Sequence, residues 1–291
     1  MVVAAIVGGS GRMGEWFANF LASSGYRVII YDKNEPATYN LKRAYKGRWN
    51  ETQAAEANII LFATPTHTTH TLLKKVAVHA PPTTLLIEIS SIKKPLRRTV
   101  ETLARKGVHI LSIHPMFGPG ARTPTNKTVL VAHQPGQSRV ADRFLSTLRR
   151  QGAKIIQCDL DTHDRIVAAT LALPHFMNFA FVETLKRAGF SLQKAREMGG
   201  TTFRLQLLVA EALYHESIQN EASILSDNRY GEEVLQVFAQ EVDQLRGLIR
   251  RNDRTKLIKH LKSGSSYARN DRWFRTAYEQ FISAVEASAY N

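Results

Sequence analysis

A glycine-rich turn close to the amino terminus constrains the fold of this chain more than any other feature. Gly9, Gly11 and Gly14 occupy the glycine positions of a G-x-G-x-x-G motif, directly after an apolar run at residues 2–7 and before a helical pattern at residues 15–23. Glycines at this spacing let backbone amides at a helix amino terminus approach a pyrophosphate. The residues predicted to hold a dinucleotide at this turn are Gly9, Ser10, Gly11, Arg12, Met13 and Gly14.

The end of the second predicted strand bears on the choice of dinucleotide. Residues 27–31 form an apolar run, and Asp32 follows it about 20 positions after Gly11. An acidic residue at this place holds the adenosine ribose hydroxyls and repels a 2′-phosphate, so NAD is the predicted cofactor. Lys33 and Arg12 lie close enough in sequence to pair with a 2′-phosphate, which keeps NADP as the alternative.

The sequence changes character near residue 160. Before it, short β-branched runs alternate with helical patterns, and the runs lie at residues 2–7, 27–31, 58–63, 84–89, 109–113, 128–132 and 154–157. After it, apolar residues recur at helical spacing without a convincing strand pattern. The sequence therefore predicts an α/β, Rossmann-type doubly wound domain over residues 1–160 with a largely parallel sheet, followed by an all-α domain over residues 161–291.

A very apolar helix is predicted near the start of the second domain. Residues 166–182 are apolar on nearly every face, and a helix of this kind must be surrounded by protein. It is expected in the centre of the helical domain or in a dimer interface, which predicts a homodimer through this domain. Pro174 falls inside the helix and is expected to bend it beside His175.

Composition limits the classes of protein to which the chain can belong. The single cysteine, Cys158, excludes an intramolecular disulfide and a cysteine-rich metal site, which favours a reducing, cytoplasmic location. The formal net charge of +14 is carried by dispersed short pairs of basic residues, which favours anionic small molecules over nucleic acid as partners. No leader peptide, membrane-spanning segment or bound metal is predicted.

Two polar clusters follow neighbouring predicted strands, where open α/β sheets bind ligands. Thr64, Pro65 and His67 close the strand at residues 58–63, and their loop is expected beside the nicotinamide. Ser91 and Lys93 follow the strand at residues 84–89 and are placed to donate hydrogen bonds to an anion. A polar loop with a solvated lysine is the alternative for the second cluster.

A histidine and an arginine complete the candidate site. His114 begins the run His-Pro-Met-Phe-Gly-Pro after the predicted strand at residues 109–113, and an imidazole there can act as a base near neutral pH. A histidine bonded to backbone in an ordinary turn is the alternative. Arg204, from the helical domain, can clamp a carboxylate through two parallel hydrogen bonds, although spacing alone supports a surface arginine equally well.

Taken together, these stretches resemble the prephenate dehydrogenase family of tyrosine biosynthesis, also called the TyrA family, and particularly the dehydrogenase part of the bifunctional bacterial enzyme. The matching stretches are residues 6–14, 65–67, 91–93, 114–119, 163–164, 175–176 and 203–205, in the family's order. The stretch at residues 114–119 is the specific one, and the others are jointly strong.

The resemblance implies oxidative decarboxylation of prephenate to 4-hydroxyphenylpyruvate with NAD. It implies that His114 accepts the hydrogen bond or proton of the ring hydroxyl, while Ser91 and Lys93 line the reacting face. It also implies that Arg204 binds a substrate carboxylate and that His175 borders the pocket near the substrate side chain. His163 and Asp164 are expected to support the pocket helix.

Two positions depart from the family's pattern. Glu88 stands where relatives often have Asp, which lengthens the side chain by one methylene. Gly120 stands where some relatives carry an acidic residue, which puts a gating or substrate contact at that place in doubt.

Three other functions compete with this interpretation. Arogenate dehydrogenase has the same chemistry with an amino group in place of the keto group. The β-hydroxyacid dehydrogenases share the layout but need a lysine four positions before an asparagine, and Pro174 occupies that place before Asn178. A non-catalytic dinucleotide-sensing regulator leaves His114, Lys93 and Arg204 without a joint purpose.

Overall fold

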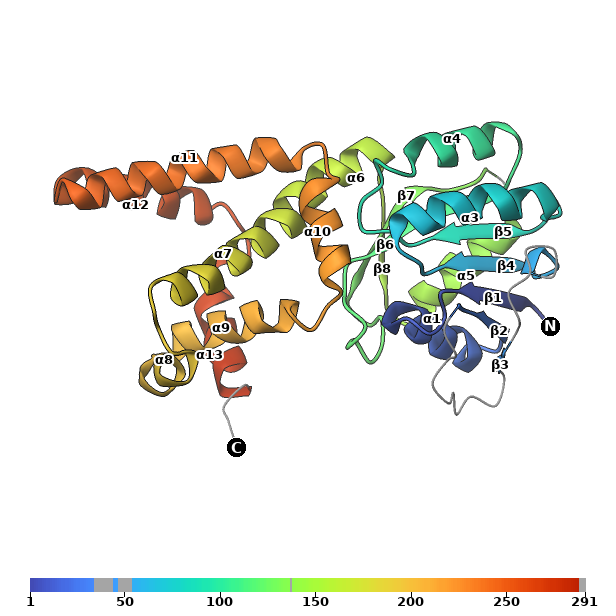
Figure 1. Ribbon diagram of the computed structural model, residues 1–291, viewed down its shortest axis with the longest axis horizontal. Coiled ribbons are helices and arrows are strands. Elements are labelled where there is room, and N and C mark those ends of the chain that lie inside the picture. Colours follow the sequence, from blue (N-terminus) through green and yellow to red (C-terminus); the bar gives the residue numbers. More distant parts are fainter. Residues whose placement is uncertain (34–43, 47–53, 137, 288–291) are drawn as a thin grey trace. The chain divides into compact units, whose positions relative to one another are not determined.

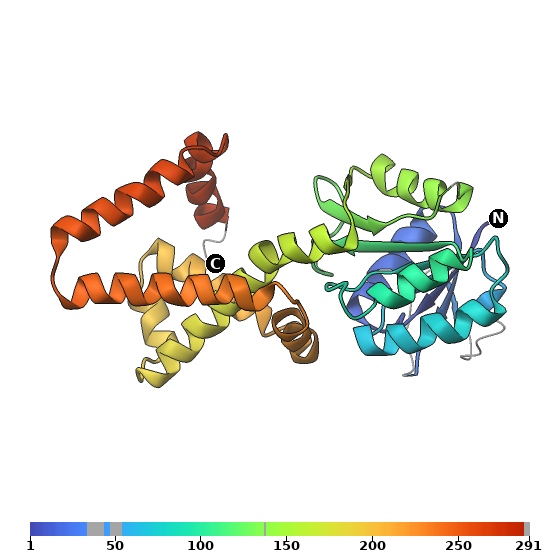
Figure 2. The ribbon, with the colours of Figure 1, turned by 90° about the horizontal axis from the view of Figure 1, so that it is seen from above.

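The computed structural model describes residues 1–33, 44–46, 54–136 and 138–287. The chain forms two compact units, Met1–Val167 with Ser226–Arg229, and Ala168–Leu225 with Tyr230–Asn291. Figure 1 labels their helices and strands, and Figure 2 shows the same ribbon from above. The predicted order, an α/β unit followed by a helical one, is confirmed.

The first unit is built on an eight-stranded sheet with the order β3-β2-β1-β4-β5-β6-β7-β8. Neighbouring strands run parallel except for β6 and β7, which are antiparallel, so the predicted largely parallel, doubly wound sheet is confirmed. The sequence predicted every strand but β3. The strands are β1 (Val3–Val7), β2 (Arg27–Tyr31), β3 (Ala44–Lys46), β4 (Ile59–Phe62), β5 (Leu85–Glu88), β6 (Ile110–Pro115), β7 (Thr128–His133) and β8 (Lys154–Gln157).

Helices cover both faces of the sheet because successive side chains of a strand point to opposite faces. Ala4 and Ile6 of β1 pack in one apolar cluster with α1 (Arg12–Ser23) and α5 (Arg139–Arg150). Ala5 and Val7 belong to a second cluster with α3 (Thr66–His79) and α4 (Arg97–Arg105). Each fully buried Ile, Leu or Phe in these clusters contributes about 1.5–3 kcal/mol. This packing fixes the strand ends that carry the candidate site.

The first unit extends to Val167, seven residues beyond the predicted boundary. The reason is that α6 (Leu160–Val167) is hydrogen-bonded to the loop after β5. The Asp164 carboxylate accepts the backbone N–H of Lys93 at 2.8 Å and that of Lys94 at 2.7 Å. Asn228 donates its side-chain amide to the Asp164 carbonyl at 2.8 Å, which holds the short segment Ser226–Arg229 in this unit.

The second unit is helical throughout the residues described. A π-helical turn, η1 (Ala168–Ala172), leads directly into α7, and Pro174 is the second residue of α7. Because proline has no N–H to donate, the wider turn accommodates the missing backbone bond at the predicted bend. The helices of this unit are α7 (Leu173–Arg187), α8 (Leu192–Met198), α9 (Thr201–Leu213), α10 (Ile218–Ser226), α11 (Gly231–Arg250), α12 (Arg254–Ala268), the 3-10 turn η2 (Phe274–Thr276) and α13 (Ala277–Ala287).

The apolar helix predicted over residues 166–182 is only partly covered within one chain. Ile166 is 49% exposed and Met177 is 43% exposed. In the part of the chain that the structure describes, one continuous helical stretch, Leu160–Arg187, has the length and apolar composition of a membrane-crossing helix. Core helices of soluble proteins have the same length and composition. At the start of this stretch, His163 and Asp164 are buried, and Asp164 is hydrogen-bonded to the loop after β5 in the first unit. We therefore interpret the stretch as a domain helix.

Candidate active site

The glycine turn has the close backbone packing that a pyrophosphate cradle requires. Gly8 adopts a φ of +81°, and its amide donates to the Tyr31 carbonyl at 2.8 Å. A Cβ at Gly14 would overlap the carbonyl oxygen of Gly8, and a Cβ at Gly9 would overlap the Ile30 side chain. Only glycine therefore fits at these positions. Gly11 is the N-cap of α1, so the helix amino terminus, with its backbone amides and partial positive charge, begins at this turn.

A cavity of about 580 Å³ lies beside this turn in the first unit. The Asp32 carboxylate at the end of β2 accepts the Ser10 amide at 2.9 Å, which fixes it at the cavity wall. Lys33 also lines the cavity, so Asp32, which would repel a 2′-phosphate, and one of the two basic residues that could pair with it are present there. The predicted cofactor residues that line this cavity are Ser10, Gly11, Asp32, Thr64, Pro65 and His67.

Four predicted cofactor residues do not line that cavity. Gly9 is packed against Ile30 and Ile6 of the neighbouring strands, Gly14 is packed against the backbone of Gly8 and Gly9, and the partly buried Met13 packs against the apolar core. Arg12 lines a different cavity of about 690 Å³, between α1 and the loop after β6. Gly120, where some relatives carry an acid, lines the same cavity, and a Cβ there would meet no atom within 4 Å.

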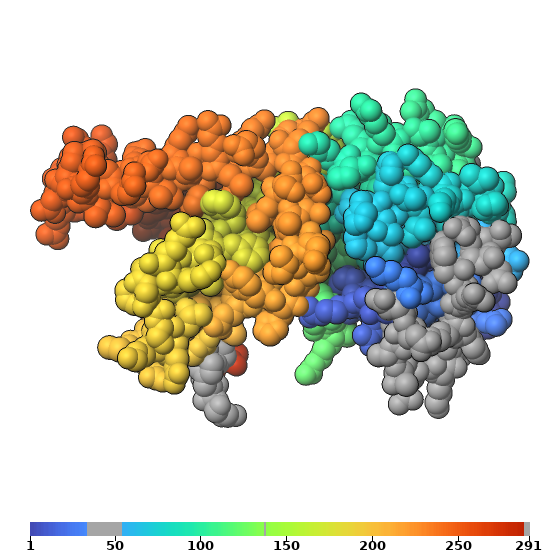
Figure 3. Space-filling view, in the orientation of Figure 1, coloured from blue at the N-terminus to red at the C-terminus, as the bar shows by residue number. Residues whose placement is uncertain are grey.

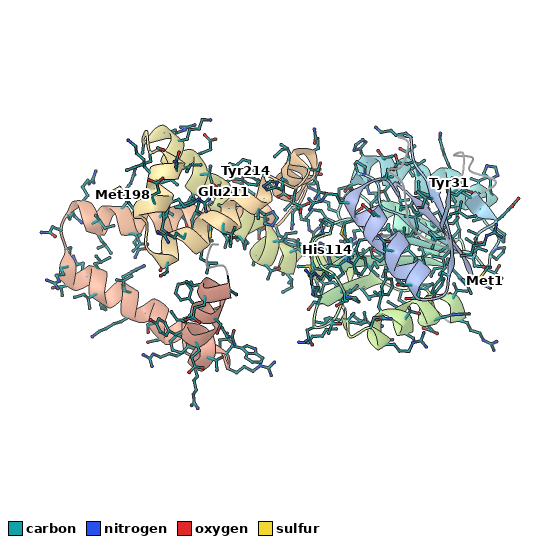
Figure 4. All side chains as sticks on the ribbon, turned by 90° about the horizontal axis from the view of Figure 1, so that it is seen from below. Met1, Tyr31, His114, Met198, Glu211 and Tyr214 are labelled. Carbon is teal, nitrogen blue, oxygen red and sulfur yellow. The ribbon has the colours of Figure 1, made fainter. Side chains whose placement is uncertain are left out.

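His114 lies at the carboxyl end of β6, and Figure 4 labels it there. Strands β4, β5 and β6 are neighbours and run parallel, so their carboxyl ends meet at one edge of the sheet. The structure therefore brings the three predicted strand-end clusters to a common edge. The His114 side chain is buried, with the residue 5% exposed. The strand continues through Pro115, so the histidine belongs to the sheet rather than to a turn.

Two residues, His163 and Asp164, form a hydrogen-bonded chain behind His114. The His163 Nδ1 atom lies 2.8 Å from the Asp164 carboxylate, and its Nε2 atom lies 3.0 Å from Nδ1 of His114. Burial lowers the His114 pKa well below its usual value, and the neighbouring His163 and Lys93 lower it further. Burial also lowers the His163 pKa, although Asp164 opposes that effect. Both imidazoles are therefore neutral near pH 7.

The neutral state and the carboxylate together determine the tautomers. An ionised carboxylate only accepts hydrogen bonds, so His163 donates from Nδ1 to Asp164 and presents a lone pair at Nε2. His114 then donates from Nδ1 to His163, which leaves the lone pair of His114 on Nε2. Among the described residues this Nε2 has no protein partner, and it is not shut off from solvent. The chain thus prepares Nε2 of His114 to accept a proton.

Lys93 does not point where the sequence predicted. Its side chain is fully buried, and the ammonium donates to the Glu88 carboxylate at 2.7 Å and to the Ile113 carbonyl at 2.7 Å. Burial lowers the Lys93 pKa, and the Glu88 charge opposes this effect. An anion in solvent cannot reach an ammonium in this position, which corrects the expected direct contact. Lys93 instead anchors the strand that carries His114.

Glu88 is the centre of this buried cluster, although in the sequence it stands out only because its side chain is one methylene longer than the Asp of many relatives. Besides Lys93, its carboxylate accepts the Ser90 amide at 2.8 Å and the Ser112 hydroxyl. Glu88 and Ser112 are direct partners in the register of β5 and β6, which explains the second contact. Glu88 therefore links the end of β5 to the strand that carries His114.

Two serines follow Glu88 at the same strand end. The predicted residue Ser91 is partly exposed, and its contact with substrate stays a prediction. Ser90, which the sequence did not single out, has a buried hydroxyl oxygen without a hydrogen-bond partner among the described residues. An unsatisfied buried hydroxyl costs about 1–3 kcal/mol, which favours a ligand at this strand end.

Arg204 and His175 belong to the second unit. The Arg204 side chain donates from Nε to the Arg196 carbonyl at 3.0 Å and from Nη2 to the Glu197 carbonyl at 3.2 Å, at the end of α8. Two of its donors thus stabilise a helix end, and its carboxylate contact stays a prediction. Nδ1 of His175 lies 2.5 Å from the carboxylate of Glu221, a buried residue that the sequence did not reveal.

Comparison with known proteins agrees with both units. Among curated proteins, a probable arogenate/prephenate dehydrogenase of Methanocaldococcus jannaschii is 24% identical over 267 residues, 90% of this chain and 60% of that protein. The T-protein of Enterobacter agglomerans is 26% identical over 280 residues, 95% of this chain and 69% of that protein. The chain thus spans about 60% of the length of the first relative.

Solved structures show the same fold. The crystal structure of prephenate dehydrogenase from A. aeolicus in complex with hydroxyphenyl propionate and NAD⁺ has a TM-score of 0.68 and 19% identity, and the match covers 92% of this chain and 97% of that one. Residues 17–135 match the family model of the prephenate dehydrogenase nucleotide-binding domain, and residues 159–263 match that of its dimerization domain. The chain therefore belongs to the prephenate dehydrogenase family.

Proposed function

We propose that this protein is an NAD-dependent dehydrogenase that converts prephenate to 4-hydroxyphenylpyruvate, with loss of carbon dioxide, in tyrosine biosynthesis. The observation that carries the proposal is the hydrogen-bonded chain from Asp164 through His163 to His114. It ends in a neutral imidazole at the sheet edge to which β4 and β5 bring the nucleotide-side and serine clusters. A regulator that only senses a dinucleotide has no need of such a base.

The residues of the first unit fit a nicotinamide dinucleotide. Gly8, Gly9 and Gly14 would let the pyrophosphate approach the amino terminus of α1, and Asp32 would accept hydrogen bonds from the adenosine ribose. The bound NAD⁺ of the A. aeolicus enzyme supports this choice of cofactor. When bound, the nicotinamide supplies the acceptor for a hydride from the ring carbon that bears the hydroxyl.

This chain's residues supply the proton acceptor and the positioning. As the hydride departs, Nε2 of His114 takes the hydroxyl proton, and His163 and Asp164 stabilise the resulting imidazolium through their hydrogen bonds. Loss of the ring carboxylate as carbon dioxide then leaves an aromatic ring, so the protein has mainly to align and hold the substrate. Ser91 is assigned to the reacting face, and Arg204 and His175 to the carboxylates and side chain of the substrate.

Arogenate is the second candidate substrate, since the name of the M. jannaschii relative includes both compounds. The experiment that tests the proposal measures reduction of NAD and of NADP by the purified protein with prephenate and with arogenate. We expect the highest kcat/KM for prephenate with NAD. Turnover of arogenate but not of prephenate would identify arogenate as the substrate. Turnover of neither compound would refute the proposed reaction.

We further propose that the enzyme is a cytoplasmic homodimer formed through the helical domain. The family model matched by residues 159–263 describes a dimerization domain. The partly exposed apolar side chains of α6 and α7 support a second copy as the cover that a single chain does not provide. Nucleic acid and membranes are not among the proposed partners.

A further inference from the structure

The chain continues beyond its matched dimerization domain into a segment that the family model does not cover. The match ends at residue 263, and the structure describes the chain to residue 287. Residues 264–287, which we call the C-terminal arm, comprise the end of α12, the turn η2 and α13. Figure 2 shows α12 leaving the end of α11 and α13 following it in red.

The arm is rich in aromatic side chains that its own chain does not bury. No residue of α12, η2 or α13 is buried, and every residue from 261 to 280 is exposed. Tyr267 is 82% exposed, Trp273 is 56% exposed and Tyr278 is 74% exposed. Large aromatic side chains gathered on one short segment are typical of an interaction surface.

Helix α13 has an apolar face at the spacing expected of a packed helix. Tyr278, Phe281, Ile282 and Val285 follow the i, i+3, i+4, i+7 pattern. The substantial contacts of α13 with another element are those with η2, inside the arm itself. An isolated helix of 11 residues is marginal in water, so its stability requires packing against a further surface.

Charge determines which kind of partner fits the arm. Residues 246–262, on α11 and α12, carry seven basic residues and one acidic residue, so much of the chain's positive charge is concentrated there, on helices that Figure 3 shows in orange. The arm itself is neutral, since Arg269, Arg272 and Arg275 are balanced by Asp271, Glu279 and Glu286. A neutral aromatic surface does not select a polyanion, and it has no net charge that opposes packing on another protein surface.

Helix α11 also has a partly exposed apolar face, like that of α13. Leu235, Phe238, Val242, Leu245 and Ile249 recur with alternating spacings of three and four residues along this helix, which is the pattern of a helix–helix seam. Val242 remains 43% exposed and Ile249 65% exposed in the single chain. The seam lies inside the matched dimerization domain, so its free part continues the surface that a second copy covers.

We infer that the C-terminal arm is an interaction surface for a second copy of this chain, and that its aromatic side chains and the apolar face of α13 pack on the helical domain of that copy. In a two-fold dimer each copy gives one arm and receives one, so the contact is made twice. The inference rests on the proposed homodimer and adds to it a segment outside the family's dimerization domain.

The test measures the dimer dissociation constant of the full chain by sedimentation velocity over a dilution series. Trp273→Glu and Ile282→Glu should each raise it at least about tenfold, since a buried charge in an interface costs more than about 1.4 kcal/mol. Val78→Glu is the matched control, because Val78 is 79% exposed on α3 of the other unit and should leave the constant unchanged. Circular dichroism checks that each variant keeps its helices.

A cross-linking measurement decides the case in which a charged variant unfolds. In a Cys158→Ser background, Tyr278→Cys with a short photoreactive label should give covalent dimers, whereas Val78→Cys should not. A monomeric wild-type chain would refute the homodimer and the arm together. A dimeric wild type with unchanged constants in both arm variants, or without covalent dimers through residue 278, would refute the arm alone.

Discussion

At the scale of single residues, the function of His114 depends on the two groups behind it. His114→Asn keeps a side chain that can bond to His163 but cannot accept a proton. We expect this variant to fold and bind NAD, with turnover reduced by about 10²–10⁴. Steady-state kinetics with a melting curve checks the prediction, and near-normal turnover in a folded variant would contradict the proton-acceptor role.

The pH dependence of turnover follows from the same residue. Because burial lowers the His114 pKa well below its usual value, the imidazole stays ready to accept a proton at pH values where an exposed histidine is already charged. The decrease of kcat toward acid pH should therefore lie below pH 6.5, which is the ordinary pKa of a histidine. Asp164→Asn should weaken the hydrogen bonds that stabilise the His114 imidazolium and so reduce kcat. The decrease of kcat toward acid pH should still lie below pH 6.5, because His114 remains buried.

A third prediction concerns the buried ion pair of Glu88 and Lys93. Lys93→Met leaves the Glu88 carboxylate without its ammonium in a fully buried place, and losing one partner of such a pair costs about 3–5 kcal/mol. The double variant Glu88→Gln with Lys93→Met removes both charges and keeps an acceptor for Ser112, so it should recover part of that loss. Urea unfolding of the wild type, the single variants Lys93→Met and Glu88→Gln and the double variant measures it. A double variant as destabilised as the sum of the two single variants would contradict the coupling.

Arg204 tests the substrate side. The Arg204 guanidinium donates two hydrogen bonds to backbone carbonyls at the end of α8, so Arg204→Ala should lower the melting temperature slightly. Loss of the proposed contact with a substrate carboxylate should raise the KM for prephenate at least about tenfold. The KM for NAD should stay the same. Lys194→Ala, on the same helix, is the control for a general effect on α8. An unchanged KM for prephenate would make Arg204 a purely structural residue.

At the scale of elements, the cap of α6 links local structure to the site. The Asp159 carboxylate accepts the Thr162 hydroxyl, the Thr162 amide at 2.8 Å and the Asp161 amide at 2.9 Å, and these hydrogen bonds lower its pKa to about 2. His163 and Asp164 follow in the first turns of this helix. Asp159→Ala should cost about 1 kcal/mol of stability and also reduce kcat, because the helix start that holds His163 loosens.

Helix α12 provides the matched control for that cap. Asp253 accepts the Lys256 amide at 3.0 Å in the same way, at the start of a helix in the other unit. Asp253→Ala should loosen its own helix and leave kcat unchanged. An equal loss of kcat in both variants would mean that the Asp159 effect reflects stability rather than the position of His163.

The same elements explain how much the sequence was able to predict. Strands with β-branched runs were recognised, whereas β3, with the sequence Ala-Tyr-Lys, has no such residue. The glycine turn and Asp32 were found because their spacing is local. The direction of Lys93 depends on Glu88, whose place is set by the β5–β6 register. The bond between His114 and His163 joins residues 49 positions apart, and only the folded chain reveals it.

At the scale of the whole molecule, the buried histidines make folding stability depend on pH. In the folded state the pKa values of His114, His163 and His133 are lowered chiefly by burial, whereas in the unfolded chain they return to about 6.5. Below that pH the unfolded state binds protons that the folded state does not. Stability should therefore fall as the pH drops from about 6.5 toward the folded-state values.

The size of this effect is set by the number of histidines that stay neutral. Each one contributes a slope of up to about 1.4 kcal/mol per pH unit. Asp159 acts in a lower window, because its folded-state pKa of about 2 lies below the ordinary 3.8, so its stabilising bonds are present above pH 4 and are lost toward pH 2. For the wild type, the urea concentration at the unfolding midpoint should be lower at pH 5.5 than at pH 7.5. The midpoint of His114→Asn should fall less, because the substitution removes a group that binds a proton in the unfolded state but not in the folded state. An equal fall in both proteins would mean that His114 is not kept neutral by the fold.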